Sequence, residues 1–362
     1  MQDKAERIIV VTGGAGFIGA NLTKRLLEEE GTKVRIFDNL SRRGVEHNLA
    51  WLRSLPDACR LEVVEGDVRD ESAVHRVIDG ASEVYHLAAQ VAVTTSMDDP
   101  FTDFDVNALG TLHVLEAARR RGRQPLVLFT STNKVYGALE GMPVELDGTH
   151  YRSSRPACRG VAEDEPLDFH SPYGCSKGAA DQYVRDYARV YDLPTIVFRM
   201  SCIAGPRQFG NEDQGWVAHF LYSVLEGQPI TIYGDGYQVR DVLHVYDLID
   251  AMMAARRNPA RTRGEVYNLG GGMERAFSVL EMLRLIERRT GQPLKLTYEA
   301  VRPGDQPWYV ADTNKLERHT GWRPRRSLEE TLAAIHAFWK EHRLRSAAPI
   351  EMKTHRLNEE VA

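Results

Sequence analysis

The chain has 362 residues, of which 43% are hydrophobic and 27% charged, a composition typical of a folded globular protein. Its net charge of −5 supplies no positive field, and no apolar run approaches the ~18 residues that span a bilayer, so we expect neither nucleic acid nor a membrane as a partner. The four cysteines, Cys59, Cys158, Cys175 and Cys202, form no Cys-x-x-Cys pair, which predicts no metal site, no disulfide scaffold and a reducing, cytoplasmic setting.

The first predicted unit is a strand, a glycine-rich turn and a helix. Residues 7–12 are a short, β-branched apolar run, typical of a strand buried on both faces of a parallel sheet. Gly13, Gly16 and Gly19 follow directly, and a helical pattern covers 20–30. Glycine suits these positions because a Cβ would keep backbone N–H groups and the helix N-terminus away from a pyrophosphate. The pattern therefore predicts a dinucleotide-binding turn.

The second predicted strand, 33–38, ends in an acid about 20 residues beyond the glycine turn. A carboxylate in that place accepts a hydrogen bond from the adenosine 2′-hydroxyl and repels a 2′-phosphate. Asp38 therefore favours NAD over NADP. Arg42 and Arg43 lie close by in the sequence and leave NADP open as an alternative.

Strands and helices continue to alternate along the chain. The expected strands are 61–65, 83–87, 126–130 and 193–199, and the expected helices are 71–78, 101–121 and 171–191. Repeated βαβ units predict a doubly wound, Rossmann-type parallel sheet, which binds ligands at the carboxyl ends of its strands. Besides the glycines and Asp38, the residues expected to contact the cofactor are Phe17, Ile18, Asn39, Asp67, Val68, Leu87, Ala88, Ala89, Gln90, Asn107, Tyr173 and Lys177.

Three residues are candidates for catalysis. Thr132 follows the strand 126–130, where its hydroxyl can hydrogen-bond a substrate oxygen. Tyr173 and Lys177 are four residues apart on a helix, so their side chains share one face. An ammonium beside a phenol of pKa about 10 favours the phenolate, and we expect Tyr173 to exchange protons near neutral pH. An isolated Tyr-x-x-x-Lys pair is more often a solvated helix face, so this interpretation depends on Thr132 and on the glycine turn.

The regular alternation is interrupted twice. Residues 138–170 form a polar insertion without clear periodicity, which we interpret as a lid or wall of the substrate cleft. From about residue 201 a smaller, mixed α/β substrate-binding domain is expected. Its predicted elements are helices at 214–226, 279–289, 313–320 and 328–342, and a hairpin of 230–233 and 237–243 around Gly234 and Gly236.

These patterns predict two domains. The Rossmann domain covers 1–200, with 138–170 inserted and 240–272 returning to it through a strand at 266–270. The nucleotide-sugar-binding domain covers 201–239 and 273–343, and 344–362 form a tail.

Together the motifs resemble the extended short-chain dehydrogenase/reductase family, in its branch of NAD-dependent nucleotide-sugar epimerases and dehydratases, from Arg7 to about Trp339. The resemblance implies NAD bound at the glycine turn and catalysis by Thr132, Tyr173 and Lys177. It also implies a homodimer or homotetramer in which the two long helices, 101–121 and 172–191, pair between subunits.

Within that branch, the stretches 131–137, 167–183 and 238–244 resemble the epimerases that invert C2 of CDP-linked sugars. The related dehydratases carry Thr-Asp-Glu where this chain has Thr132, Asn133 and Lys134, which argues against a 4,6-dehydratase. The resemblance implies that a CDP-sugar is the partner, and that the residues in contact with it are Thr132, Asn133, Lys134, Gln208, Gln214, Arg240, Arg302 and Asp305. The two guanidinium groups suit a diphosphate, although either arginine alone is compatible with a surface salt bridge.

Two alternatives stay open at this point. One is another nucleotide-sugar epimerase, acting at C2 of CDP-glucose or at C4 of a UDP-sugar, because the residues that recognise the sugar lie in loops. The other is a non-catalytic NAD-binding protein built on the same scaffold.

Overall fold

The structure is a computed structural model that describes residues 7–120, 122, 124–302 and 305–347. Its centre is a seven-stranded parallel sheet in the order β12-β8-β5-β4-β1-β2-β3. The strands are β1 (Arg7–Thr12), β2 (Thr32–Asp38), β3 (Leu61–Glu65), β4 (Ala81–His86), β5 (Leu126–Thr132), β8 (Thr195–Met200) and β12 (Glu265–Leu269). The doubly wound, Rossmann-type sheet predicted from the sequence is confirmed.

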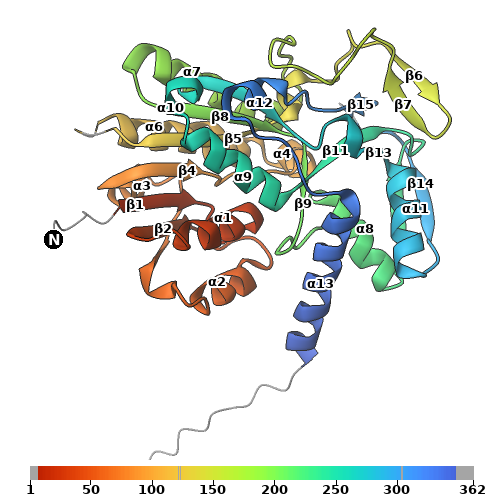
Figure 1. Ribbon diagram of the computed structural model, residues 1–362, viewed down its shortest axis with the longest axis horizontal. Helices are drawn as coiled ribbons and strands as arrows, with labels where there is room; N and C mark the ends of the chain where they lie inside the picture. The colour runs from red at the N-terminus through yellow and green to blue at the C-terminus, as the bar shows by residue number, and fades with distance from the viewer. Residues whose placement is uncertain (1–6, 121, 123, 303–304, 348–362) are drawn as a thin grey trace, which may run out of the picture.

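Helices cover both faces of the main sheet (Figure 1). Alternate residues of β1 point to opposite sides, so that Ile9 and Val11 belong to one hydrophobic core and Val10 to the other. The first core is closed by α1 (Phe17–Leu27), α2 (Val45–Arg53) and α9 (Val245–Arg256). The second is closed by α3 (Glu71–Ile78), α6 (Gly110–Arg119) and α7 (Ser171–Tyr191). Because these strands are buried on both faces, their sequences are nearly continuous runs of apolar residues.

The helix predicted over 101–121 is broken into shorter elements. They are α5 (Pro100–Phe104), a π-helical turn (Asp105–Leu109) and α6, and a further helix, α4 (Val93–Asp98), precedes them. The Asp99 side chain accepts a hydrogen bond from Thr102 N and caps α5, and Pro100 occupies the first turn, where a missing N–H is tolerated. Residue 121, at the end of the predicted helix, lies outside the described residues.

The C-terminal part is a smaller mixed α/β domain. The strand β11 (Val239–His244) pairs with β9 (Cys202–Ala204), β13 (Ala276–Ser278) and β15 (Trp308–Tyr309), and β10 (Ile230–Tyr233) pairs with β14 (Leu296–Glu299). The strands β9, β10 and β11 pack with α8 (Trp216–Leu225), α11 (Val279–Thr290) and α13 (Leu328–Ala347) around a separate hydrophobic core, whereas β15 contributes to another one. The remaining short helices are α10 (Pro259–Thr262) and α12 (Asn314–Thr320).

The predicted hairpin of 230–233 and 237–243 is wrong. β10 and β11 do not pair; β10 runs parallel to β14, and β11 lies inside another sheet with all six of its residues buried. The glycines that suggested a hairpin do turn the chain, with φ of 85° at Gly234 and 79° at Gly236. At Gly236 the small residue is required by α11 instead, because a Cβ there would lie 2.8 Å from Leu280 Cγ.

The inserted segment 138–170 contains structure that its sequence did not reveal. Two strands, β6 (Val144–Asp147) and β7 (His150–Ser153), form an antiparallel hairpin. The segment packs on the smaller domain, where Val161 bridges to Ala311 and Tyr151 N donates to Tyr237 O at 3.0 Å. In the range 240–272, β11 belongs to the smaller sheet, whereas α9 and β12 join the Rossmann domain.

At the C-terminal end, α13 continues to Ala347, and 348–362 of the predicted tail lie outside the described residues. Within the described ranges, none of the helices combines the length and the apolarity needed to cross a bilayer.

Candidate active site

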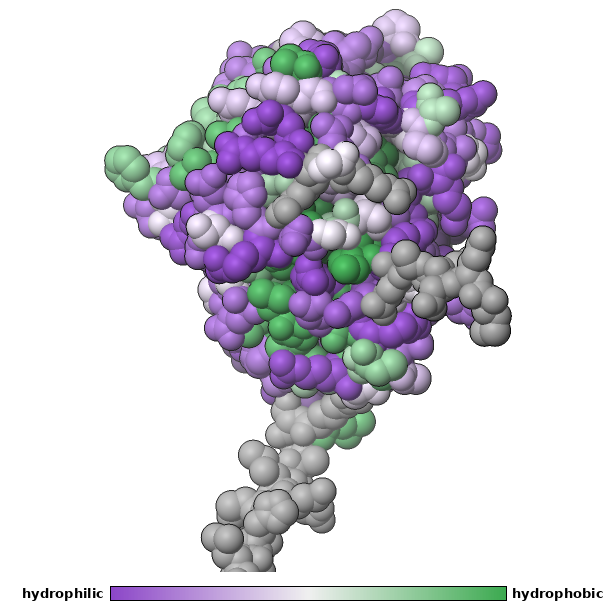
Figure 2. Space-filling model, turned by 90° about the vertical axis from the view of Figure 1, so that its left-hand side faces the viewer, coloured by the Kyte–Doolittle hydropathy of each residue, from purple (hydrophilic) through white to green (hydrophobic). Residues whose placement is uncertain are grey.

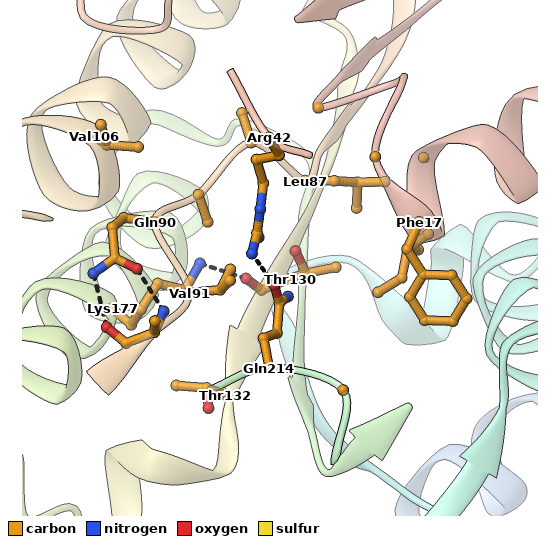
Figure 3. A pocket seen from close by; sticks show the side chains of 18 of the residues that line it. Phe17, Arg42, Leu87, Gln90, Val91, Val106, Thr130, Thr132, Lys177 and Gln214 are labelled. Atoms are coloured by element: carbon orange, nitrogen blue, oxygen red, sulfur yellow. Dashed lines mark hydrogen bonds between the residues drawn. The ribbon is translucent and has the colours of Figure 1, made fainter. Parts of the chain in front are cut away.

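A cavity of about 660 Å³ runs along the carboxyl ends of the central strands. One side of it is formed by the glycine turn and by the ends of β1, β2, β4 and β5, and the other by the segment from Met200 to Val217, between β8 and α8. A volume of this size suits a cofactor-sized or drug-sized ligand. The predicted cofactor and substrate regions therefore open into one space (Figure 3).

The glycine turn has the close backbone packing that a dinucleotide site requires. A Cβ on Gly19 would lie 2.1 Å from Gly13 O, and one on Gly13, whose φ is 68°, would lie 2.8 Å from Ala88 N. Gly16 is the N-cap of α1 and offers no side-chain cap, so the first N–H groups of the helix remain available to a ligand. Gly13, Gly16 and the first turn of α1 all line the cavity. These residues fit a pyrophosphate.

Asp38 lies on the cavity wall at the end of β2. Its Oδ2 accepts a hydrogen bond from Ala15 N at 3.0 Å and its Oδ1 accepts one from Leu40 N at 2.9 Å. Burial raises the pKa of the carboxyl, and these hydrogen bonds act in the opposite direction. The carboxylate is thus held in place beside the glycine turn, where the sequence predicted contact with a ribose.

Asp67 forms a second acidic point on the same wall. Hydrogen bonds from Arg69 lower its pKa to about 2 against the effect of burial, and Asn39 Nδ2 also donates to its Oδ2 at 2.9 Å. Asp67 is therefore ionised at any physiological pH. Arg69, which also lines the cavity, was not predicted from the sequence.

The other predicted cofactor residues line the cavity with one exception. Those that do are Phe17, Ile18, Asn39, Val68, Leu87, Ala88, Ala89, Gln90, Tyr173 and Lys177. Asn107 is not on the wall but supports it, because its Oδ1 accepts from Gln90 N and its Nδ2 donates to Gln90 O, both at 3.0 Å. Its contact with the cofactor stays a prediction, and the structure shows that it holds the loop after β4.

The structure brings together Thr132, Tyr173 and Lys177, and all three line the cavity. Lys177 Nζ donates to Thr130 O at 2.7 Å (Figure 3) and lies 4.2 Å from the centroid of the Phe129 ring. Burial lowers the pKa of Lys177 to about 7. The lysine is therefore anchored on β5.

The expectation that Lys177 makes Tyr173 acidic is not met in this structure. Burial raises the pKa of Tyr173 to about 12, a hydrogen bond from Thr132 lowers it, Asp103 raises it and the charge of Arg42 lowers it. Removal from water disfavours the phenolate more strongly than the neighbouring groups favour it. Sequence spacing showed that Tyr173 and Lys177 share a face, but it carried no information about their burial.

The predicted substrate residues fall into two groups. Thr132, Asn133, Gln208 and Gln214 line the cavity, whereas Lys134, Arg240, Arg302 and Asp305 do not. Arg240 Nη2 lies 2.6 Å from Asp305 Oδ1, and Lys134 Nζ lies 3.4 Å from the same oxygen. Burial acts to raise the pKa of Asp305, but these two cations hold it below its usual value. The cluster is within electrostatic reach of Cys202, which is on the cavity wall.

Arg302 is engaged by acidic and aromatic side chains instead of facing the cavity. Its guanidinium lies 3.5 Å from Glu212 Oε1 and 3.7 Å from Asp213 Oδ1, and 3.8 Å from the centroid of the Tyr233 ring. Asp213 itself lines the cavity, so Arg302 is one side chain removed from it. A ligand that binds the Arg302 guanidinium has to displace the carboxylates of Glu212 and Asp213.

Arg42 is the main residue at the site that sequence reasoning did not assign to it. Its side chain extends into the cavity from the loop after β2 and donates a hydrogen bond to Gln214 Oε1 (Figure 3). This contact joins the two sides of the cavity. The adjacent arginines suggested only a 2′-phosphate, because nothing in the sequence relates Arg42 to a residue 172 positions away. Met200, Ser201 and Cys202 were also missed, although they follow a predicted strand.

Comparisons with known proteins agree with this geometry. The family model described as GDP-mannose 4,6 dehydratase matches residues 10–335. The chain is 43% identical to CDP-paratose 2-epimerase of Salmonella typhi, over 89% of this chain and 96% of that protein. It is 33% identical to UDP-glucose 4-epimerase of Mycolicibacterium smegmatis, over 91% of this chain and 98% of that protein. The crystal structure of UDP-glucuronic acid 4-epimerase from Bacillus cereus, in complex with UDP-glucuronic acid and NAD, matches with a TM-score of 0.79 and 27% identity, over 92% of this chain and 99% of that one.

Proposed function

The chain belongs to the GDP-mannose 4,6-dehydratase family of NAD-dependent nucleotide-sugar epimerases and dehydratases, and from that premise we propose that it is a CDP-sugar 2-epimerase that interconverts CDP-paratose and CDP-tyvelose. The observation that carries the proposal is the 43% identity to a CDP-paratose 2-epimerase, against 33% to the UDP-glucose 4-epimerase, with nearly complete coverage in both cases.

The side chains at 133 and 134 support an epimerase against a dehydratase. Elimination of water needs an acid and a base beside the sugar, and the dehydratases resembled by the chain place carboxylates there. In this chain Asn133 Nδ2 donates to Gln306 Oε1 at 3.3 Å, and Lys134 is paired with Asp305. Neither residue offers a carboxyl group.

The cofactor is NAD, which, when bound, accepts a hydride from the sugar carbon and returns it. We assign its pyrophosphate to the glycine turn and the N-terminus of α1, and its adenosine ribose to Asp38. We expect the Asp67 carboxylate to accept a hydrogen bond from the adenine amino group. The residues around Leu87 and Gln90 line the part of the cavity wall along which the cofactor would lie.

Proton transfer is assigned to Tyr173. In its ionised form Tyr173 is the base that removes the proton of the C2 hydroxyl while that carbon is oxidised, which leaves a 2-keto sugar, and in its neutral form it is the acid that returns a proton on the reverse step. Thr132 hydrogen-bonds Tyr173 and orients the proton, and Lys177 supplies a positive charge when it is protonated. Between the two steps the sugar turns about its bond to the diphosphate, so that C2 is reduced on the opposite face and its configuration inverts.

The diphosphate is assigned to Arg240 and Arg302. Both guanidinium groups are held by carboxylates, Arg240 by Asp305 and Arg302 by Glu212 and Asp213. Phosphate oxygens replace those carboxylates as bidentate partners. A clamped diphosphate keeps the nucleotide in place while the sugar turns.

The proposal is tested by incubating the purified protein with separate CDP- and UDP-sugars in D₂O and following the products by NMR. We expect CDP-paratose and CDP-tyvelose to interconvert without deuterium at C2, because the hydrogen on that carbon moves as a hydride and does not exchange with solvent. Deuterium at C2 would contradict the hydride mechanism.

The alternative functions give different products in the same experiment. Inversion of CDP-glucose at C2 alone, or of a UDP-sugar at C4, would replace the proposed substrate while leaving the mechanism intact. Bound NAD with no turnover of any sugar would identify a non-catalytic NAD-binding protein.

We also propose that two copies pair through α4, α5 and α7. These helices pack against one another and carry large hydrophobic side chains on their exposed surface: Met97, Phe101, Phe104, Tyr183, Val190 and Tyr191. On the face shown in Figure 2, hydrophobic residues lie in separate groups between hydrophilic ones. Large hydrophobic side chains that are exposed on helices in contact with one another are typical of an interface.

Phe101→Glu is expected to weaken this dimer by at least about 30-fold, because Phe101 is 83% exposed in the single chain and a central aromatic contact contributes ~2 kcal/mol or more. Light scattering after size exclusion, over a range of protein concentrations, measures the change. Leu344→Glu, at a residue 73% exposed on α13, is the matched control and leaves the molar mass unchanged. Equal molar masses for the Phe101→Glu and unaltered proteins at all concentrations would contradict the proposed interface.

A further inference from the structure

A buried carboxylate contacts the turn of α7 that carries Tyr173 and Lys177. Asp103, on α5, is 0% exposed. Its Oδ2 accepts a hydrogen bond of 2.5 Å from Ser176 Oγ, and its Oδ1 accepts one of 3.1 Å from Asn107 Nδ2. Both oxygens therefore have a polar partner inside the protein. Ser176 immediately precedes Lys177, so Asp103 is joined directly to the candidate catalytic turn.

The same network reaches the cavity wall. Asn107, which donates to Asp103, also exchanges two hydrogen bonds with the backbone of Gln90, a residue that lines the cavity. Asn107 lies in the π-helical turn Asp105–Leu109, which follows α5 directly. Wide helical turns of this type recur at functional sites, where they re-aim side chains. Asp103 is therefore connected to both the α7 turn and the loop after β4.

The cationic and titratable groups near Tyr173 and Lys177 come from several elements. On β4, burial and the charge of Lys177 lower the pKa of His86 to about 3, so this imidazole is neutral. From the loop after β2, the Arg42 guanidinium favours the phenolate of Tyr173. β5 presents the carbonyl oxygen of Thr130 and the aromatic ring of Phe129 to Lys177 Nζ. None of these groups is negative.

Two carboxylates favour the protonated form of Lys177, and they differ in their partners. Asp181, one turn further along α7, has the larger influence on Lys177, and it also forms two hydrogen bonds of 2.9 Å with Arg199 of β8. Asp103 makes no ion pair with any other residue in the described part of the chain. Its charge favours the ammonium form of Lys177, which in turn lowers the pKa of Asp103, and it disfavours the phenolate of Tyr173.

We propose that Asp103 is a positioning residue, which holds the turn of α7 that carries Tyr173 and Lys177 through Ser176, and whose negative charge adds to that of Asp181 in favouring the ammonium form of Lys177. The proposal rests on the assignment of proton transfer to Tyr173 and Lys177. It gives a role to a carboxyl group whose pKa is raised by burial and which forms no ion pair among the residues that the structure describes. Asp103 acts through Ser176 and Lys177 and does not itself touch the reacting atoms.

Asp103→Asn tests the charge while keeping the shape of the side chain. Loss of a negative charge disfavours the ammonium of Lys177 and favours the phenolate of Tyr173, so the pKa values of both groups fall. We expect the whole profile of kcat against pH to move by about one unit toward lower pH, at near-normal NAD content. The matched control is Asp105→Asn, which removes the same charge from the half-buried residue two positions further on and leaves the profile in place.

A second readout does not depend on turnover. The ultraviolet absorbance change of phenolate formation, taken as the difference between each protein and its Tyr173→Phe counterpart, gives the titration of Tyr173 alone. Its midpoint is expected to fall in Asp103→Asn. Asp103→Ser, which also removes the charge, is expected to give the same shift, so the test stands even where Asp103→Asn folds poorly.

A loss of rate with an unmoved pH profile and an unmoved Tyr173 titration in both Asp103 variants would show that Asp103 is only structural, and would overturn the inference. Failure of the proposed function looks different. It appears in the unaltered protein, as an absence of turnover or as full activity of Tyr173→Phe.

Discussion

Replacing Tyr173 with phenylalanine is expected to lower kcat by about 10³-fold while the protein keeps its fold and its NAD. The hydroxyl is the proposed base and acid of the cycle, and its loss removes the group that hydrogen-bonds Thr132 and exchanges the proton. The ring itself remains, and with it the packing of a side chain that is 8% exposed. Steady-state rates with the preferred CDP-sugar measure the effect.

The control for this change is Tyr298→Phe, which removes the same atom from a side chain that is 58% exposed on β14. It is expected to leave kcat unaltered. The NAD content of each protein, released by denaturation and quantified, shows whether the cofactor site is intact. Retention of more than about a tenth of the activity by Tyr173→Phe would rule out its role as the acid and base.

Replacing Arg199 with methionine is expected to lower the free energy of unfolding by about 3–5 kcal/mol. Arg199 and Asp181 form a bidentate pair in which both side chains are almost completely buried, at 1% and 0% exposed. Arg199 also donates to the Tyr136 hydroxyl at 2.9 Å, and that hydroxyl donates to Asn268 Oδ1 at 2.8 Å. Removal of the guanidinium leaves a buried carboxylate without a counter-ion, one turn from Lys177. Urea unfolding followed by circular dichroism measures the loss.

The matched control for the buried pair is the exposed pair of Arg263 and Asp192, in which the side chains are 41% and 90% exposed. Arg263→Met is expected to cost less than about 1 kcal/mol, because water already solvates both charges. Similar losses in the two variants would mean that burial does not decide the contribution of the Arg199 pair. A loss below about 1 kcal/mol in Arg199→Met would have the same consequence.

The strengths and errors of sequence-based prediction for this chain follow from the range of the interactions concerned. The strands of the main sheet were predictable because a strand buried on both faces has hydrophobic residues at consecutive positions, a pattern that is visible in the strand's own sequence. The helix α2 was missed, although Val45, Leu49 and Leu52 stand at helical spacing and are buried. The false hairpin at β10 and β11 shows the limit of turn residues. Gly234 and Gly236 turn the chain, but they do not determine which strand each neighbour pairs with.

The candidate site divides in the same way. The sequence predicted that Gly13, Gly16, Gly19 and Asp38 surround one ligand, and the structure places them on one cavity. The positions of Arg240 and Arg302 were less predictable, because long side chains can pair with acids from several directions. Asp305, Glu212 and Asp213 hold them away from the cavity wall.

By itself, the amino-acid sequence determined the Rossmann sheet and the glycine turn, because local backbone requirements and hydrophobic patterns are properties of neighbouring positions. It also predicted Thr132, Tyr173 and Lys177 as candidates for catalysis, from their spacing together with a family resemblance. Only the tertiary structure decided the electrostatics of those residues. Tyr173 and Lys177 share a helix face as their spacing predicts, but burial moves their pKa values to about 12 and about 7.

The contacts that complete the site were likewise beyond the sequence. Ser176 meets Asp103 across 73 positions, and Arg42 meets Gln214 across 172. The removal of a charged group from water, and the approach of another charge to it, depend on which distant segments fold against it. Desolvation and the distances between charged groups determine the pKa values at the site.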